Sequence, residues 1–221
     1  MEETTSKEKM LKSIRNALIH KSIHPYPGVD LESSVYAHSN DTLDLTFAEE
    51  FTKANGQFVY CEDVMALVDN LKIMAHEKKW TNIFSFDNQL SKVLEAAEIV
   101  HSSKDEDFES LKVAVTFCES LIARLGSILI SSRQTAGRRL NIYPEIHVVV
   151  AMSSQIMPDI RDAMKTIREK YSGRLPSLIS LITGPSRTAG IEASLVPGGQ
   201  GPREVFVFLV DDTPMKSNDE Q

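Results

Sequence analysis

The chain contains only two cysteines, Cys61 and Cys118, among 221 residues. They lie far apart in the sequence and neither belongs to a C-x-x-C motif, so they cannot by themselves build an iron–sulfur cluster or a structural zinc site. We expect both to be buried, reduced thiols. His20 and His24 have helical spacing, but Pro25 follows at once and no third ligand is evident. The sequence therefore predicts no metal site and no cofactor in this chain.

Long apolar runs are also missing. No segment approaches the roughly 18 apolar residues of a membrane-spanning helix, and the polar N-terminus lacks the apolar core of a signal peptide. We therefore expect a cytoplasmic protein without membrane insertion.

Basic residues are outnumbered as well, with 24 Lys and Arg against 31 Asp and Glu and a net charge of −7. This charge opposes binding to nucleic acid or to anionic membranes.

Two common phosphate-binding motifs are absent. In the segment Gly184–Gly190 the second glycine comes one position too late for a P-loop, and Ile191-Glu192 stands where Lys-Ser/Thr is needed. No G-x-G-x-x-G follows an early strand, so Rossmann-type dinucleotide binding has no support.

What the sequence does contain is an alternation of strand-like and helical segments from Gln57 onward. This pattern predicts one α/β domain, a three-layer αβα arrangement with a mostly parallel sheet, over residues 57–212. A helical arm and linker (1–56) precede it and a polar tail (213–221) follows. The expected helices are Ser6–Ile19, Leu45–Ala54, Asp63–Lys79, Asn88–Ala97 and Pro158–Tyr171, with a helical turn at Glu119–Arg124. The expected strands are Phe58–Cys61, Thr81–Phe86, Ile99–His101, Val113–Phe117, Ser127–Ser131, Ile146–Met152, Ser177–Thr183 and Val205–Val210.

Two loops of unusual composition follow strands, at Ser132–Glu145 and Thr183–Glu204. Ligands in parallel α/β sheets bind outside the carboxyl ends of strands, so we expect both loops to face one crevice. Arginine is concentrated in or beside these loops, and its planar guanidinium binds carboxylate or phosphate groups through two hydrogen bonds. The loops therefore predict a small anionic ligand, although pairing with surface acids is the alternative for each arginine. These arginines are Arg124, Arg133, Arg138, Arg139, Arg187 and Arg203.

Two carboxylates lie nearest the expected crevice. Glu119 and Glu192 could act as nucleophile or general base, or could serve only to orient an arginine or cap a helix. The segment Pro197–Pro202 could cradle an anion through its N–H groups or form a plain turn. His147 lies within an apolar strand, where a core histidine is more common than a catalyst.

The C-terminal stretch from Ile182 to Asp212 resembles the signature of the LUD family, the LutC/YkgG-type lactate utilisation proteins. Gly184-Pro-Ser-Arg-Thr-Ala and Ile191-Glu192 match its motif, and Gly198, Gly201 and Pro202 match the following Gly-x-x-Gly-Pro segment. Cys118–Val150 is similar to the family's second block. At two positions the chain departs from the family pattern: Gly190 replaces an aspartate, and Arg124-Leu125 replaces a polar pair before Gly126-Ser127.

This resemblance implies a fold similar to the NagB/RpiA/CoA-transferase superfamily and a part in oxidising L-lactate to pyruvate. It also implies partner subunits that carry iron–sulfur clusters, with this chain as the cluster-free member. The alternatives are a stand-alone transferase, isomerase or ligase, and a non-catalytic ligand sensor. The loops and the resemblance together nominate one set of ligand-binding residues: Gly184, Ser186, Arg187, Thr188, Gly126, Ser127, Arg139, Gly198, Gly199 and Gly201.

Overall fold

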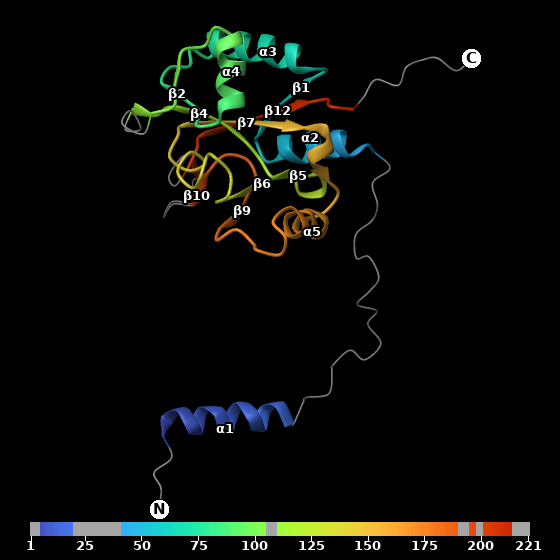
Figure 1. Cartoon of the computed structure of the whole chain (residues 1–221), viewed down its shortest axis with the longest axis vertical. Coiled ribbons are helices and arrows are strands. Elements are labelled where there is room, and N and C mark those ends of the chain that lie inside the picture. The colour runs from blue at the N-terminus through green and yellow to red at the C-terminus, as the bar shows by residue number, and fades with distance from the viewer. Residues whose placement is uncertain (1–4, 20–40, 105–109, 190–194, 198–200, 214–221) are drawn as a thin grey trace, which may run out of the picture. The chain divides into compact units, whose positions relative to one another are not determined.

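The computed structural model describes residues 5–19, 41–104, 110–189, 195–197 and 201–213 (Figure 1). The chain divides into two compact units, Met1–His38 and Ser39–Gln221. In the first, helix α1 (Ser6–Ile19) forms as predicted, and none of its residues is buried. No helix within these ranges is long and apolar enough to cross a bilayer.

The second unit is built on a six-stranded sheet in which every pairing is parallel. Its strands run in the order β1 (Gln57–Cys61), β12 (Glu204–Val210), β7 (Ile146–Met152), β4 (Val113–Phe117), β2 (Ile83–Phe84) and β3 (His101–Ser102). The valine-rich strand β7 and the aromatic strand β12 are central and almost completely buried, as expected for strands covered on both faces. The α/β fold and its parallel sheet are therefore as predicted.

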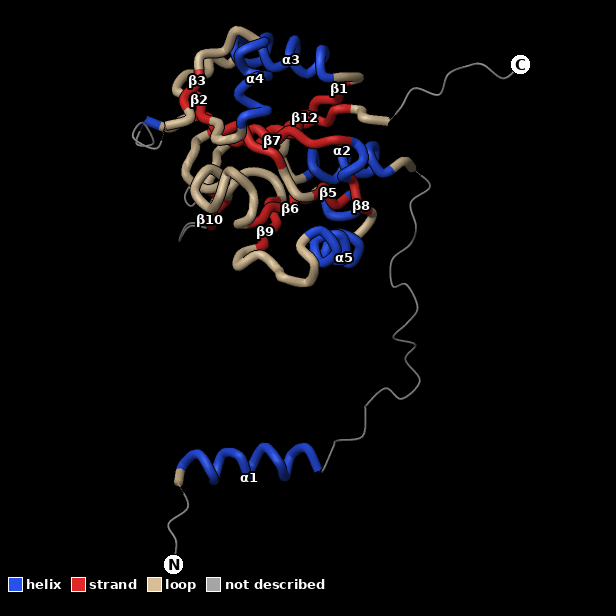
Figure 2. The backbone as a smooth tube through the Cα atoms, viewed as in Figure 1, coloured by secondary structure: helices blue, strands red, loops and turns tan. Residues whose placement is uncertain are grey.

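Helices α3 (Val64–Glu77) and α4 (Asn88–Ala96) cover one face of this sheet (Figures 1 and 2). Their buried leucines pack with Trp80, Val148, Val150, Phe206 and Phe208 in one apolar cluster. Asp63 and Asp87 cap the N-termini of the two helices, and each side chain accepts a backbone N–H of the first turn. These caps satisfy donors that the helix itself leaves unpaired.

A second, four-stranded sheet lies on the other face. Its order is β8 (Ile156–Met157), β5 (Ser120–Ile122), β6 (Ser127–Ser131) and β9 (Ile179–Ile182), and helix α5 (Ile160–Lys170) packs against its outer side. The sequence did not predict this sheet, and the helical turn expected at Glu119–Arg124 was wrong. Strand β5 and a short 3-10 turn (Ala123–Leu125) stand there instead. So short a turn can join β5 to β6 only as an antiparallel hairpin.

Helix α2 (Leu43–Lys53) lies between the two sheets. It belongs to the second unit and not to the N-terminal arm in which we placed it. Phe47 and Phe51 are fully buried and their rings stack with centroids 5.4 Å apart. Gly126 has a φ of +54°, and a Cβ there would lie 2.3 Å from the backbone nitrogen of Phe51. A side chain at that position would push α2 out of the core.

A buried carboxylate joins the second sheet to α5. The Glu119 side chain is 1% exposed and accepts hydrogen bonds from Lys170 Nζ at 2.6 Å, Tyr171 OH at 2.6 Å and Ser131 Oγ at 2.5 Å. Burial alone would raise its pKa, but the three donors outweigh burial, so the pKa is lowered. Glu119 is therefore ionised at neutral pH.

Side chains at the carboxyl edge of the six-stranded sheet hydrogen-bond to one another. Asp211, directly after β12, accepts from Tyr60 OH at 2.9 Å and Ser153 Oγ at 3.1 Å. Asp212 accepts from the backbone and hydroxyl of Ser154 at 2.9 and 2.5 Å. Hydrogen bonds from Thr213, and then from Tyr60, lower the pKa of Asp211 to about 2. These hydrogen bonds tie the ends of β1 and β12 to the turn that follows β7.

We predict that Gly126→Ala lowers the free energy of unfolding by about 3 kcal/mol or more, because it adds a backbone clash to left-handed strain. Gly137→Ala is the matched control: Gly137 also has a positive φ, +60°, but nothing lies within 4 Å of an added Cβ. It should cost only about 1–2 kcal/mol. Urea unfolding of both variants measures the difference, and equal losses would disprove the seating of α2 on Gly126.

We also predict an acid-dependent contribution from Glu119. Its folded pKa is lowered, so its stabilisation is present above the ordinary carboxyl pKa and is lost as pH falls through the folded value. Glu119→Gln should cost about 1–3 kcal/mol at pH 7 and flatten the decline in stability below about pH 4.5. Glu98→Gln, at an exposed ion pair with Lys72, should change little. An unchanged acid profile in Glu119→Gln would contradict the network.

Candidate functional site

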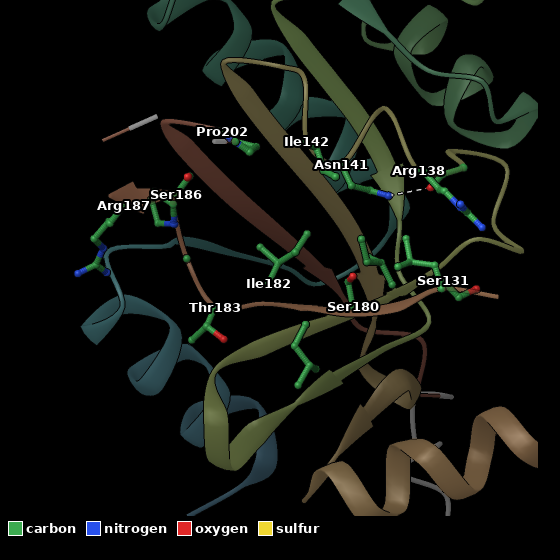
Figure 3. A pocket seen from close by; sticks show the side chains of 17 residues that line it. Ser131, Arg138, Asn141, Ile142, Ser180, Ile182, Thr183, Ser186, Arg187 and Pro202 are labelled. Atoms are coloured by element: carbon green, nitrogen blue, oxygen red, sulfur yellow. Dashed lines mark hydrogen bonds between the residues drawn. The ribbon is translucent and has the colours of Figure 1, made fainter. Parts of the chain in front are cut away.

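A pocket of about 400 Å³ lies against the inner face of the second sheet (Figure 3). Strands β6 and β9 contribute Ile130, Ser180 and Ile182, and the two unusual loops supply the remaining walls. Its lining in the described part of the chain contains two arginines and no acidic residue. The residues are Ile130, Ser131, Gly137, Arg138, Asn141, Ile142, Leu178, Ser180, Leu181, Ile182, Thr183, Gly184, Pro185, Ser186, Arg187, Gly201 and Pro202.

The two loops meet at this pocket, but not in the way that we expected. We placed the crevice at the carboxyl ends of parallel strands. Strands β6 and β9 are antiparallel, so the loops that follow them leave from opposite ends of the second sheet. They converge because one continues into β7 and the other into β12, and these are neighbouring parallel strands of the large sheet. The pocket therefore lies near the amino ends of β7 and β12.

The first loop is held by its own polar side chains. Asn141 is 4% exposed, and its Nδ2 donates to the carbonyl of Gly137 at 3.0 Å. Arg138 lines the pocket and donates from its guanidinium to Ser177 Oγ at 2.8 Å. Arg139, which we nominated, is exposed and does not line the pocket. The neighbouring arginine, Arg138, lines the pocket in its place.

The Gly-Pro-Ser-Arg segment is pressed against the C-terminus of helix α2. Gly184 has a φ of +75°, and a Cβ there would lie 2.3 Å from the carbonyl oxygen of Ala54. The Arg187 guanidinium donates to the same carbonyl. A cation at the carboxyl end of a helix is favourable, because the last carbonyl groups have no partner within the helix. Two motif residues that we nominated for ligand binding thus also fasten the loop to α2.

The later part of the motif packs on the earlier part. Ser186 N donates to the carbonyl of Pro202 at 2.8 Å, and a Cβ added to Gly201 would lie 3.1 Å from Ser186 Cβ. Thr188 belongs to strand β10 (Arg187–Ala189), which pairs with β11 (Leu195–Pro197). Glu192, Gly198 and Gly199 lie outside the described residues, so those nominations remain predictions.

Gly126 and Ser127, which we nominated from the second block of the family resemblance, do not line the pocket. Ser127 Oγ and Thr183 Oγ1 lie 2.7 Å apart and join the start of β6 to the end of β9. Gly126 seats helix α2, as described above. Arg124, one of the departures from the family pattern, pairs with Asp159 at 2.6 Å and lowers the pKa of that carboxyl group. This arginine stabilises the turn into α5.

Glu119 has both carboxylate oxygens occupied by the donors of the network with α5. A general base needs a free lone pair directed at the substrate, so this geometry favours the structural alternative over the catalytic one. His147 is likewise held in the core: its Nε2 lies 2.8 Å from Thr116 Oγ1, and burial lowers its pKa to about 4. It is neutral at physiological pH.

The cysteines are buried on different faces of the large sheet. Cys61 packs with the α3 and α4 cluster and Cys118 with the α2 cluster. Burial raises the pKa of Cys118 to about 12, so it stays a thiol. Among the described residues, no three His, Cys, Asp or Glu side chains are placed to hold a metal ion.

Several polar side chains that line the pocket were not nominated from the sequence: Ser131, Arg138, Asn141, Ser180 and Thr183. Arg138 was noted among the loop arginines but not nominated. Asn141 carried a usable signal, because a polar residue beside the apolar Leu140 in a loop often turns inward. Ser180 carried a weaker one, since it interrupts a strand of Leu and Ile. The path of the loop in the folded protein decides which of its residues face the pocket. The sequence alone therefore could not decide between Arg138 and Arg139.

Comparison with known proteins adds independent findings. The family model of the LUD domain matches residues 35–210. A protein named lactate utilization protein C from Shouchella clausii is 34% identical over 108 residues, covering 48% of this chain and 47% of that protein. The protein of the same name from Bacillus subtilis is 34% identical over 106 residues, covering 47% and 44%. The matched part of the chain thus spans about half the length of these curated relatives.

A solved structure of a DUF162 family protein from Deinococcus radiodurans has a similar fold. The TM-score is 0.53 at 17% identity, and the similarity covers 76% of this chain and 96% of that one. At this sequence identity the comparison shows similarity of fold alone. The family model, in contrast, covers both unusual loops, both sheets and helix α2. By its sequence and its fold, this chain belongs to the LUD domain family.

Proposed function

We propose that this protein takes part in lactate utilisation as an accessory or subunit that binds a small carboxylate in the pocket. The relatives named lactate utilization protein C supply the metabolic context. The observation that carries the binding role is the described lining itself, which combines two arginines with no acid in a protein of net charge −7. A cationic lining in an acidic protein favours an anionic ligand.

In this structure the two guanidinium groups point away from the centre of the pocket, on opposite sides of it (Figure 3). The printed contact of Arg187 uses one N–H donor on a neutral carbonyl. A guanidinium has five donors in a planar fork, and a carboxylate accepts more strongly than a carbonyl. A bound carboxylate would therefore draw Arg187 inward beside Ser186, whose hydroxyl has no hydrogen-bond partner among the described residues.

The proposal extends to the partners of this chain. We propose that electron transfer in lactate oxidation occurs on iron–sulfur partner subunits, and that this chain holds no cluster. Its two cysteines support this assignment, because they are buried on opposite faces of one sheet and cannot meet at a cluster. The role of this chain would then be to bind the substrate or product and to dock with the cluster-bearing subunits.

Arg187 provides the binding test. L-Lactate should bind the wild-type protein in isothermal titration calorimetry, and Arg187→Gln should weaken binding by at least about tenfold through the loss of a charge-assisted pair. Arg168→Gln, on the exposed last turn of α5, is the matched control and should bind like the wild type. Thermal unfolding of each variant separates lost binding from lost docking on Ala54. Full affinity in a folded Arg187→Gln protein would refute the site.

Growth provides the functional test. A strain that lacks this gene should fail to grow on L-lactate as sole carbon source and should grow normally on pyruvate, because only the oxidation step is lost. The wild-type gene should restore growth, and the Arg187→Gln gene should not. Normal growth of the deletion strain on lactate would overturn the proposed role.

A further inference from the structure

The pocket is larger and more apolar than lactate requires. Lactate has six heavy atoms. A water molecule occupies about 30 Å³ in the liquid, and if each heavy atom of lactate takes no more than that, lactate fills less than half of the pocket. The volume of the pocket is about 400 Å³. A ligand that left the remaining space unfilled would gain little from burial.

The unused part of the pocket has an aliphatic wall. Ile182 and Ile130 are neighbours across the β6–β9 ladder, where Ile130 pairs with Ser180, and their side chains belong to the inner, α2-facing cluster. Figure 3 shows Ile182 in the middle of the pocket, with Ser180 beside it on the same strand and Ile142 above. Ile142 is 50% exposed, so it offers apolar surface that a ligand can cover. Charged and apolar groups thus occupy different parts of one cavity.

Asn141 adds a directional feature. Its Nδ2 is bound to the Gly137 carbonyl, which fixes the amide orientation, because the reverse orientation would set two oxygens against each other. Its Oδ1 is buried and has no hydrogen-bond partner among the described residues. The residue as a whole is only 4% exposed. Asn141 lines the pocket, and a ligand with a hydrogen-bond donor, such as a hydroxyl group, would supply the partner that this acceptor lacks.

We infer that the pocket takes aliphatic 2-hydroxy carboxylic acids with a chain longer than that of lactate, about four to eight carbons. The carboxylate meets Arg187 and Ser186, the hydroxyl lies on the side of Asn141, and the aliphatic chain covers Ile182 and Ile142. This inference rests on the proposed carboxylate site, and it identifies the class of ligand that the site holds best.

A chain-length series tests the inference. Calorimetric titration of the full-length protein with L-lactate and the L-2-hydroxy acids of four, five, six and eight carbons should show affinity rising about fourfold for each added methylene. Butanoate and hexanoate, which lack the hydroxyl, should bind more weakly than the hydroxy acids of equal length. An affinity that is flat or falls with chain length would overturn the inference.

Ser180→Met is the variant that separates size from charge, because it fills the aliphatic part without touching the arginines. It should abolish the rise in affinity with chain length, and a rise as steep as that of the wild type would contradict the aliphatic subsite. Ser91→Met, on helix α4 away from the pocket, is the matched control and should keep the full series. If Ser180→Met does not fold, the wild-type series alone decides the question.

The outcomes also distinguish this inference from the function on which it rests. Lactate binding without any gain from longer chains would sustain the proposed carboxylate site and reject the longer ligand. Binding that rises with chain length but survives Arg187→Gln would reject the carboxylate contact and leave only an apolar cavity. Absence of binding by every acid in the series would reject both.

Discussion

The seating of helix α2 is the contact on which the rest of the fold depends. The helix fills the space between the large sheet and the second sheet with Phe47 and Phe51, both fully buried. Two glycines with positive φ, Gly126 and Gly184, bring loop backbone against it where a Cβ would collide. Arg187 then covers the carbonyl of Ala54 at its end. Removal of α2 would open the core and release the Gly184–Arg187 segment from its contacts with Ala54.

This arrangement gives the Gly-Pro-Ser-Arg segment two roles. Gly184 and Arg187 hold the loop on α2, and the same turn presents Ser186 and Pro185 to the pocket. The contact of Arg187 with a neutral carbonyl leaves its positive charge beside the cavity without an acidic partner among the described residues. The guanidinium remains partly exposed and has further N–H donors available. One motif thus both holds the loop on α2 and lines the pocket.

The ionisable groups follow a consistent division. Glu119 is buried with a cation and two hydroxyl donors, so it keeps its charge and ties α5 to the second sheet. His147 is buried without a charged partner, so it loses its proton. Asp211 and Asp212 hydrogen-bond to Tyr60, Ser153 and Ser154 at the carboxyl edge of the large sheet, which is the usual ligand edge of such folds. The cavity is left at the opposite edge, where the loops before β7 and β12 meet.

The sequence by itself determined the parallel sheet and its helices, because buried runs such as Ile146–Met152 and amphipathic segments such as Val64–Glu77 reveal their periods locally. It also marked the two loops through their glycines and arginines. Only the tertiary structure decided that β5, β6 and β9 form a separate antiparallel sheet, that α2 belongs to the core, and that Arg138 instead of Arg139 lines the pocket. Those outcomes depend on contacts between residues far apart in the chain, and local periodicity carries no information about such contacts.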